Sequence, residues 1–285
     1  MKKNPLISSP LPCAGLVVTV LLAMSSMASA QTTVFQDNME GGSGGLNGRT
    51  VSPTAQVGAS NQWLGSQSGQ TGTQLSVGNT TATFGKAAAG FDDALLAPGT
   101  TSFTMTTSWS IDDATWVDTG SNIYFGFGNA SGDGRGTGQV TPPTNGFYDN
   151  QLAFGFKLSG DFTGTSATIK AGVGSNPSDY SASFTRSSDS VDWAGDFQIT
   201  YDILTSMAYL SFKNTGNGET AFTQLAAVSY TGDIGGLWFK ADSLPNSAHA
   251  GFLFDDITVT AVPESSSSAL IAGVLGLACV VIRRR

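Results

Sequence analysis

The chain has 285 residues and a formal net charge of −8 at pH 7. Positions 31–262 hold 8 basic and 20 acidic residues, a formal charge of −12, and the basic residues are scattered along the sequence. An acidic chain without a basic cluster is not suited to bind nucleic acid. The 36 glycines, together with the excess of Asp over Glu, are typical of a turn-rich, helix-poor protein.

The first 30 residues have the three parts of a secretory signal peptide. Lys2 and Lys3 form a basic start, residues 14–24 an apolar core, and Ala28-Ser29-Ala30 a small-residue cleavage site. Cleavage by signal peptidase after Ala30 makes Gln31 the first mature residue. An uncleaved anchor is the alternative, but an apolar core of 11 residues is short for a membrane span.

Residues 31–100 are rich in Gly, Ser, Thr and Gln and contain few apolar anchors. These anchors are Phe35, Leu46, Trp63 and Leu75. Widely spaced anchors in a polar segment favour edge strands joined by long loops. For residues 41–62 a disordered linker is the alternative interpretation.

From residue 102 onward, apolar residues alternate with polar ones, which is the pattern of strands with one buried face. The expected strands are 102–111, 123–128, 152–158, 167–173, 197–203, 208–212, 222–230, 237–240 and 250–261. Turn signals lie between them at 132–134, 142–146, 175–177 and 214–218. Many short strands with one apolar face predict an all-β fold, an antiparallel β-sandwich.

Two segments resemble concanavalin A-like (laminin G-like) jelly-roll domains of bacterial surface proteins. Leu46-Asn47-Gly48-Arg49-Thr50, followed by Trp63, is similar to the opening of such domains. Residues 197–212, with a turn at Leu204-Thr205-Ser206, are similar to their central hairpin. The resemblance implies a jelly roll whose last strand, residues 252–262, returns to pair beside the first. Another β-sandwich topology is the alternative.

The C-terminus carries a Pro-Glu pair, four serines, an uncharged apolar run from Ala269 to Ile282, and three arginines. The run alone reaches about 21 Å as a helix. With the serines it has 18 uncharged residues, near the lower limit for a membrane span. A buried core helix is the alternative, but terminal arginines favour a transmembrane helix, at about residues 266–282, with its basic end in the cytoplasm.

This order of Pro-Glu pair, short apolar helix and basic end resembles the PEP-CTERM sorting tail of Gram-negative bacteria. The resemblance implies a processing motif and a basic end, which fall on Val262, Pro263, Glu264, Arg283, Arg284 and Arg285. It also implies cleavage by exosortase, a membrane-embedded cysteine peptidase, and release to the cell surface or its exopolysaccharide. Ser265 stands where the family usually has a second proline.

Residues 31–262 contain no recognisable catalytic pattern. Jelly-roll glycosidases use paired glutamates on one strand, as Glu-x-Asp-x-Glu, whereas this part has only Glu40 and Glu219. Adjacent aspartates such as Asp255-Asp256 point to opposite faces of a strand. His249 is the only histidine, and no Gly-x-Ser-x-Gly motif accompanies it. We therefore expect that the chain is not an enzyme.

Two groups of residues are candidates for ligand binding. Asn129, Ser131 and Asp133 place oxygen side chains at alternate positions, which resembles half of a Ca²⁺ loop; a Gly-rich turn is the alternative. No other cofactor is indicated. The aromatic residues near turn signals are candidates for stacking on sugar rings, with burial in the core as the alternative. They are Trp116, Tyr148 and Trp193.

The sequence thus predicts a signal peptide over 1–30, an exported all-β body over 31–262 and a sorting tail over 263–285. Basic residues at both ends place the body outside the inner membrane. We expect a protein of the cell envelope or extracellular matrix of a Gram-negative-type bacterium, with a non-catalytic, structural or polysaccharide-associated body. A lectin-like carbohydrate-binding module is the alternative, and a glycoside-active enzyme comes third.

Overall fold

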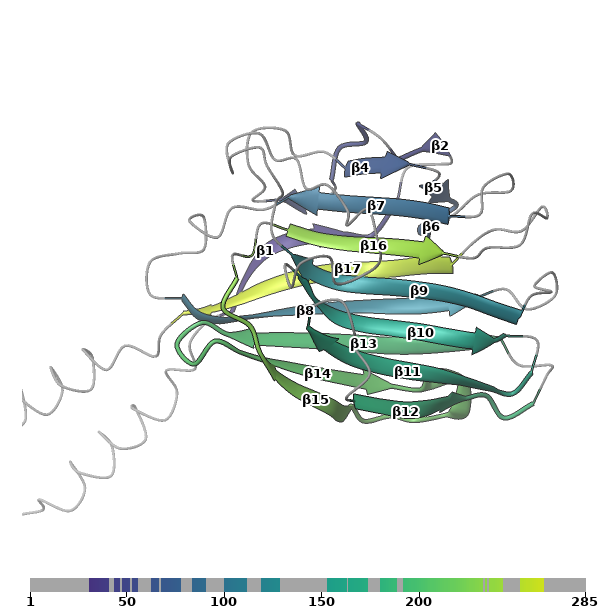
Figure 1. The fold of residues 1–285 in the computed structure, drawn as a ribbon. Helices are drawn as coiled ribbons and strands as arrows, with labels where there is room; N and C mark the ends of the chain where they lie inside the picture. The colour runs from purple at the N-terminus through teal and green to yellow at the C-terminus, as the bar shows by residue number, and fades with distance from the viewer. Residues whose placement is uncertain are drawn as a thin grey trace, which may run out of the picture. The chain divides into compact units, whose positions relative to one another are not determined.

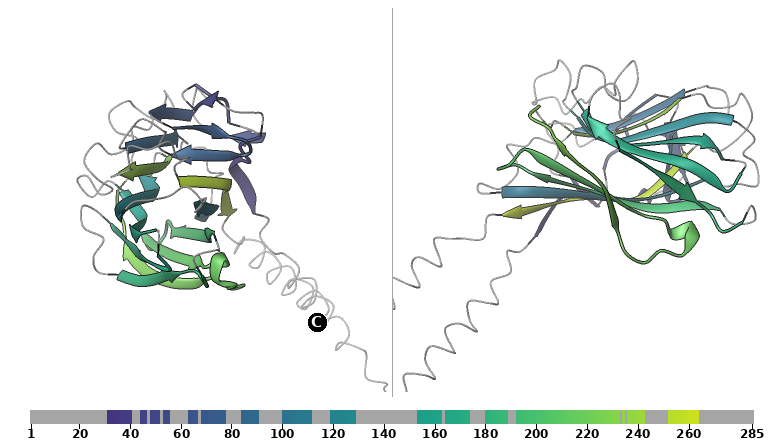
Figure 2. Two further views of the ribbon diagram at one scale, coloured as in Figure 1. Left: turned by 90° about the vertical axis from the view of Figure 1, so that its right-hand side faces the viewer. Right: turned by 60° about the horizontal axis from the view of Figure 1, so that its bottom comes forward.

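Two antiparallel sheets packed face to face make up the body of the protein (Figures 1 and 2). The computed structural model describes residues 31–40, 44–46, 48–51, 53–55, 63–66, 68–77, 84–90, 100–111, 119–128, 153–162, 164–173, 180–188, 192–232, 234, 236–242 and 252–263. Residues Gln31–Val262 form one compact unit. The predicted all-β sandwich is confirmed.

The first sheet has ten strands. Eight follow the order β15 (Thr223–Ser229), β14 (Met207–Lys213), β13 (Trp193–Asp202), β8 (Thr100–Ile111), β17 (Phe252–Pro263), β6 (Gln74–Val77), β5 (Ser68–Thr71) and β2 (Gly44–Gly45). The other two are β1 (Thr32–Asp37), which pairs with β17, and β3 (Pro53–Ala55), which pairs with β1.

The second sheet has seven strands, and in Figure 1 its strands run across the front of the first sheet. Their order is β12 (Tyr180–Thr185), β11 (Ser166–Val173), β10 (Ala153–Asp161), β9 (Thr119–Gly128), β16 (Gly236–Asp242), β7 (Phe84–Gly90) and β4 (Trp63–Ser66). Each strand of this sheet is antiparallel to its neighbours.

Each of the nine strands expected after residue 101 has a counterpart in the structure. Strands β7 and β12 were not expected. The first is a Gly-Ala run without alternation, whereas the second does alternate Tyr180, Ala182 and Phe184 with hydroxyl residues and was overlooked. Strand β7 instead forms where β4 and β16 pair with its two edges. Pairing partners on both sides compensate for its weak intrinsic preference for a strand.

The first and last strands lie side by side, as the jelly-roll resemblance implies. β1 pairs with β17 from Thr32 opposite Ala261 to Asp37 opposite Ile257. The anchors expected in residues 31–100 are all fully buried: Phe35, Leu46, Trp63 and Leu75. The described parts of this segment are therefore short strands and turns of the sandwich, while 41–43, 47, 52 and 56–62 lie outside the described residues.

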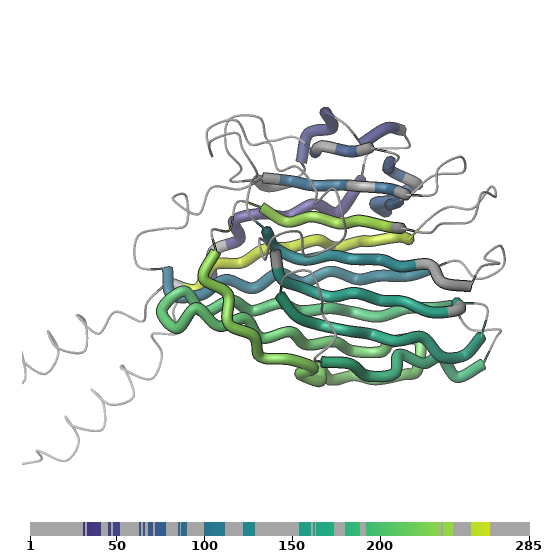
Figure 3. The backbone as a smooth tube through the Cα atoms, viewed as in Figure 1, coloured from purple at the N-terminus to yellow at the C-terminus, as the bar shows by residue number. Residues whose placement is uncertain are grey.

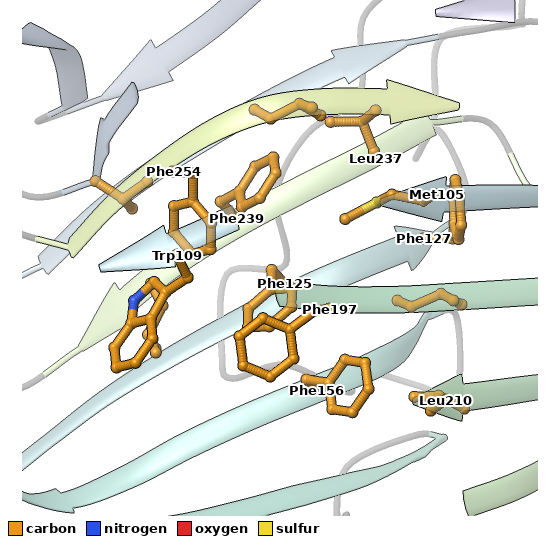
Figure 4. Packing of buried hydrophobic residues seen from close by; sticks show 14 of the residues in the cluster. Met105, Trp109, Phe125, Phe127, Phe156, Phe197, Leu210, Leu237, Phe239 and Phe254 are labelled. Carbon is orange, nitrogen blue, oxygen red and sulfur yellow. The ribbon is translucent and has the colours of Figure 1, made fainter. Parts of the chain in front are cut away.

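The core between the sheets is dominated by aromatic rings (Figure 4). Phe125 of β9 lies 4.8 Å from Phe197 of β13 and 5.3 Å from Phe254 of β17, measured between ring centroids. Phe239 of β16 lies 4.6 Å from Phe254. Edge-to-face and tilted pairs of this kind add specific geometry to the burial of apolar area. They join the two sheets without disulfides, since neither Cys13 nor Cys279 belongs to the body.

The Leu46–Thr50 motif ties the first strands together through a buried carboxylate. Asp37, at the end of β1, is fully buried and accepts two bonds from the Arg49 guanidinium, at 2.6 and 3.0 Å. The indole N–H of Trp63 and the backbone N–H of Met39 also donate to it, at 2.7 and 2.8 Å. Arg49 donates a further bond to Gln70 at 2.8 Å. The motif is thus a structural clamp.

Within the described residues no helix is long and apolar enough to cross a membrane. The predicted signal peptide with Ala28 and Ala30, the expected transmembrane segment and Arg283–Arg285 lie outside the described residues. Of the processing motif, Val262 and Pro263 are described and end strand β17, whereas Glu264 is outside.

Candidate functional site

The outer face of the seven-stranded sheet is the surface on which functional side chains gather. Alternation along each strand sends one set of residues into the core and the next set outward. In β9 and β10, Phe125 and Phe156 are buried between the sheets, so Tyr124 and Lys157 lie on the outer face. In β16, Phe239 is inward and Lys240 outward for the same reason.

Strand register brings four lysine positions into one row across this sheet. Lys170 of β11 is opposite Lys157, and Lys157 is opposite Tyr124. Tyr124 is opposite Lys240, and Lys240 is opposite Lys86 of β7. Half of the eight basic residues in 31–262 therefore occupy one cross-strand row, although they are far apart in the sequence. The basic residues are scattered along the sequence, but the fold aligns half of them.

Tyr124 is flanked by two of these lysines. The ammonium groups of Lys157 and Lys240 lie 5.1 and 5.7 Å from the centre of its ring. Within about 6 Å of a ring centroid, the negative face of the ring attracts a cation. Tyr124 and Lys240 are almost completely buried, with exposed fractions of 8% and 3%. Removal from water strengthens the attraction between the ring and the ammonium group. Tyr124 thus offsets part of the repulsion between neighbouring lysines.

The rows on either side of the lysines differ in character. On one side, Gly172, Gly155 and Gly126 stand opposite one another, followed by Trp238. A Cβ atom at Gly126 would lie 2.1 Å from the carbonyl oxygen of Phe154, so no side chain fits there. On the other side is a row of hydroxyl and amide residues that ends at an acidic position: Ser183, Thr168, Ser159, Asn122 and then Asp242 of β16.

The accessible part of this face lies over β10, β11 and β12. The glycines of the central row and Trp238 are buried, whereas the lysines and hydroxyls nearer the β12 edge are partly or fully exposed. We call this accessible set the hydroxyl–lysine face. It consists of Lys157, Ser159, Thr168, Lys170, Ser181 and Ser183. None of these positions is acidic, in a body with 20 acidic residues, so the face can receive an anionic, hydroxyl-rich ligand.

The expected stacking role of Trp193 is wrong. Trp193 is fully buried, and its indole N–H donates to the carbonyl oxygen of Phe162 at 2.7 Å. The Arg186 guanidinium lies 5.2 Å from the centre of its ring. Burial in the core, the alternative reading, holds because β13 turns Trp193 toward the opposite sheet. Trp116 and Tyr148 lie outside the described residues.

The predicted calcium ligands Asn129, Ser131 and Asp133 also lie outside the described residues. Within the described part of the chain, no three His, Cys, Asp or Glu side chains come together as a metal site. Asp255 and Asp256 are described, in β17. Burial raises the pKa of Asp255. The hydrogen bond from the Asp256 backbone N–H lowers this pKa in part, and the negative charges of Asp256 and Glu40 raise it.

The two glutamates of the body do not form a pair. Glu219 follows β14, where its carboxylate accepts a bond from the backbone N–H of Asn214 at 2.9 Å. Glu40 follows β1, and the strands β13, β8 and β17 lie between β14 and β1 in the sheet order. A pair of catalytic carboxylates has to be within about 10 Å. The bond from Asn214 instead gives Glu219 a structural role in the turn between β14 and β15.

No protein-family model and no curated protein matches this chain. Among solved structures, it is similar to the winged bean acidic lectin complexed with methyl-α-D-galactose, with 14% identity, a TM-score of 0.45, and coverage of 82% of this chain and 99% of the lectin. It is also similar to the exoplasmic domain of VIP36 in its Ca²⁺/Man2-bound form, with 9% identity, a TM-score of 0.42, and coverage of 81% and 87%. A third is the CBM2 module of the evolved Dit of Lactobacillus casei BL23 phage J-1, with 9% identity, a TM-score of 0.46, and coverage of 82% and 96%. Similarities at this level do not indicate what this chain binds.

Sequence reasoning missed the hydroxyl–lysine face. Its signal is an apolar–Lys–apolar triplet in two separate strands, Phe156-Lys157-Leu158 and Ile169-Lys170-Ala171. A third triplet, Phe239-Lys240-Ala241, belongs to the same row, but Lys240 is buried. Each triplet predicts an outward lysine between two inward residues. The triplets do not reveal that the lysines are neighbours, because that depends on the register between strands.

Proposed function

We propose that this chain is an exported, non-catalytic protein of the cell surface or extracellular matrix that associates with an acidic polysaccharide. The pattern of residues 1–30 supports export through signal peptidase. The pattern Val262-Pro263-Glu264 with Arg283–Arg285 supports sorting by exosortase, with a transient membrane anchor at about 266–282. The finer fold in this proposal is a concanavalin A-like jelly roll.

The observation that carries the polysaccharide role is the hydroxyl–lysine face. Lys157 and Lys170 are direct neighbours in register, and hydroxyl side chains flank them. Serine and threonine hydroxyls both donate and accept hydrogen bonds, as sugar hydroxyls do. Charges are screened over about 8 Å at physiological salt, so an anion on this face responds to the nearby lysines more than to distant aspartates. A sugar chain that carries carboxylates fits both features.

A set of lysine variants tests the proposal. The double variant Lys157→Gln/Lys170→Gln is compared with Lys213→Gln, which removes one positive charge from the other sheet, where Lys213 pairs with Asp196 at 2.5 Å. We expect the double variant to bind a polyuronate such as alginate about three- to tenfold more weakly, since each exposed ion pair contributes up to about 1 kcal/mol. The Lys213 variant should bind as the unchanged protein does.

Affinity electrophoresis in gels with alginate or neutral dextran measures this difference. Equal retardation of the unchanged protein and the double variant by alginate would refute the assignment of the face. The absence of retardation by any polysaccharide would leave a structural role for the body in the envelope.

Calcium binding by Asn129, Ser131 and Asp133 stays a separate proposal, based on their spacing alone. Carboxylate and amide oxygens suit Ca²⁺, which would stabilise the folded state by mass action. We expect the melting midpoint to fall when a chelator removes the ion. An unchanged midpoint would remove Ca²⁺ from the proposed function.

A further inference from the structure

The turn between β13 and β14 presents two apolar side chains to solvent. Leu204 is 75% exposed and Ile203 is 38% exposed. Leu204 is the most exposed of the large hydrophobic residues in the described part of the chain. We call residues 203–206 the apolar turn. Figure 3 shows it at the end of the β13–β14 hairpin, on the left of the body.

Hydrogen bonds hold the apolar turn in one conformation. The Asp202 carboxylate accepts bonds from the backbone N–H groups of Leu204 and Thr205, at 2.9 and 3.1 Å. Ser206, with φ of 54°, accepts a bond from the backbone N–H of Tyr230 at 2.9 Å. An Asx-type turn fixed on both sides does not fold its leucine back onto the body. The exposure of Leu204 is therefore built into the hairpin.

The apolar turn lies at the point where the last strand leaves the body. The backbone N–H of Ile203 donates to the carbonyl oxygen of Thr101 at 2.8 Å. The hydroxyl of the same Thr101 donates to the carbonyl oxygen of Val262 at 3.3 Å. One residue thus bridges the turn and the first residue of the processing motif, and Figure 1 shows the ends of β13 and β17 together on the left.

We propose that the apolar turn rests on the lipid bilayer surface while the chain still carries its tail. This inference depends on the proposed transmembrane segment. Five residues, Glu264–Ser268, separate Pro263 from the apolar run, and they span at most about 17 Å when extended. The interfacial layer on each side of a bilayer is itself about 5–8 Å thick. The end of β17 therefore lies within reach of the lipid headgroups, and so does Leu204.

Tethering explains why one rigid leucine with a neighbouring isoleucine suffices. The tail keeps the body at the membrane, so contact of the turn with lipid is an intramolecular event with a high effective concentration. The apolar side chains gain from leaving water for the boundary between headgroups and acyl chains. The contact fixes the orientation of Val262-Pro263-Glu264 at the surface where a membrane-embedded peptidase acts.

Fluorescence quenching in vesicles tests the contact directly. In the mature chain, which begins at Gln31 and carries Cys279→Ser, the variants Leu204→Cys and Phe222→Cys are each labelled with bimane. Phe222 is the matched control, because it is 40% exposed but follows β14 at the opposite end of the hairpin. The chains are reconstituted into phosphatidylcholine vesicles that contain lipids spin-labelled near the headgroup. We expect quenching of the label at position 204 and none at position 222.

Flotation of the same vesicles separates the two proposals. If the chain floats but positions 204 and 222 are quenched equally or not at all, the lipid contact is wrong and the membrane tail stands. If the chain does not float, the membrane tail fails and the contact fails with it. Processing in cells adds a second readout. If Leu204→Asp is cleaved more slowly but the label at position 204 is not quenched in vesicles, the turn contacts the peptidase and the lipid contact is wrong.

Discussion

Replacing Arg49 by methionine is expected to destabilise the body far more than its position on a short, polar segment suggests. Methionine keeps much of the apolar stem but removes the donors that Arg49 directs at Asp37 and Gln70. The Asp37 carboxylate stays fully buried, with only Trp63 and Met39 donating to it. Leaving one charge of a buried pair uncompensated costs about 3–5 kcal/mol.

Urea unfolding followed by near-UV circular dichroism measures this cost. For a body of 232 residues, about 3–5 kcal/mol corresponds to a fall in the melting temperature of roughly 6–20 °C. Lys213→Met is the matched control, because it breaks the partly exposed pair with Asp196. The control should cost less than about 1 kcal/mol, since exposed pairs contribute little.

A double-mutant cycle separates the pair from its surroundings. Asp37→Asn together with Arg49→Met removes both charges, so the double variant should be less destabilised than the sum of the two single variants, by about 1–3 kcal/mol. A cost for Arg49→Met no larger than that of Lys213→Met would refute the reasoning, because the clamp would then behave as a surface ion pair.

Three further changes test other parts of the structure. Gly126→Ala should lower the melting temperature, because the added Cβ meets the Phe154 carbonyl oxygen at 2.1 Å and costs about 1–3 kcal/mol or more in free energy of unfolding. An unchanged melting temperature would contradict this close approach of β9 and β10. Asp255→Asn should make the body more stable near neutral pH and leave its stability unchanged below the ordinary carboxyl pKa of 3.8. Because the pKa of Asp255 is raised in the folded state, the unchanged protein loses stability as the pH rises from 3.8 through the raised value. Parallel stability–pH curves for the variant and the unchanged protein would contradict this prediction. Pro263→Ala with Glu264→Ala should leave the intact form in the membrane fraction on immunoblots, and continued release would show that the motif is not the processing site.

The fold class was predictable because it depends on local alternation. In β8, for example, Phe103, Met105, Thr107 and Trp109 are buried and the residues that alternate with them are not, a period of two that the sequence shows directly. The boundary of each strand was less accurate. Strand β7 was missed because pairing with neighbouring strands stabilises a segment whose own pattern is weak, whereas β12 was missed although its residues alternate.

The candidate site was predictable only in part, and Trp193 and Arg49 show why. A tryptophan near a turn can be a sugar platform or, more commonly, part of the core, and the direction of β13 places Trp193 inside. Arg49 belongs to a recognisable motif, but its partner Asp37 lies 12 residues away, at the end of β1. Neither the burial of Trp193 nor the pairing of Arg49 with Asp37 can be read from the few residues on either side of them.

The sequence by itself determined the alternation that makes strands, the acidic charge and the patterns at the two ends from which export and sorting are proposed. All of these are properties of neighbouring residues, and local sequence contains them. Only the tertiary structure decided that Lys170, Lys157, Tyr124, Lys240 and Lys86 share one row, and that Thr101 bonds to both Ile203 and Val262. The physical reason is register: a shift of one residue between strands reverses every outward side chain, and cooperative packing of the whole aromatic core selects the register.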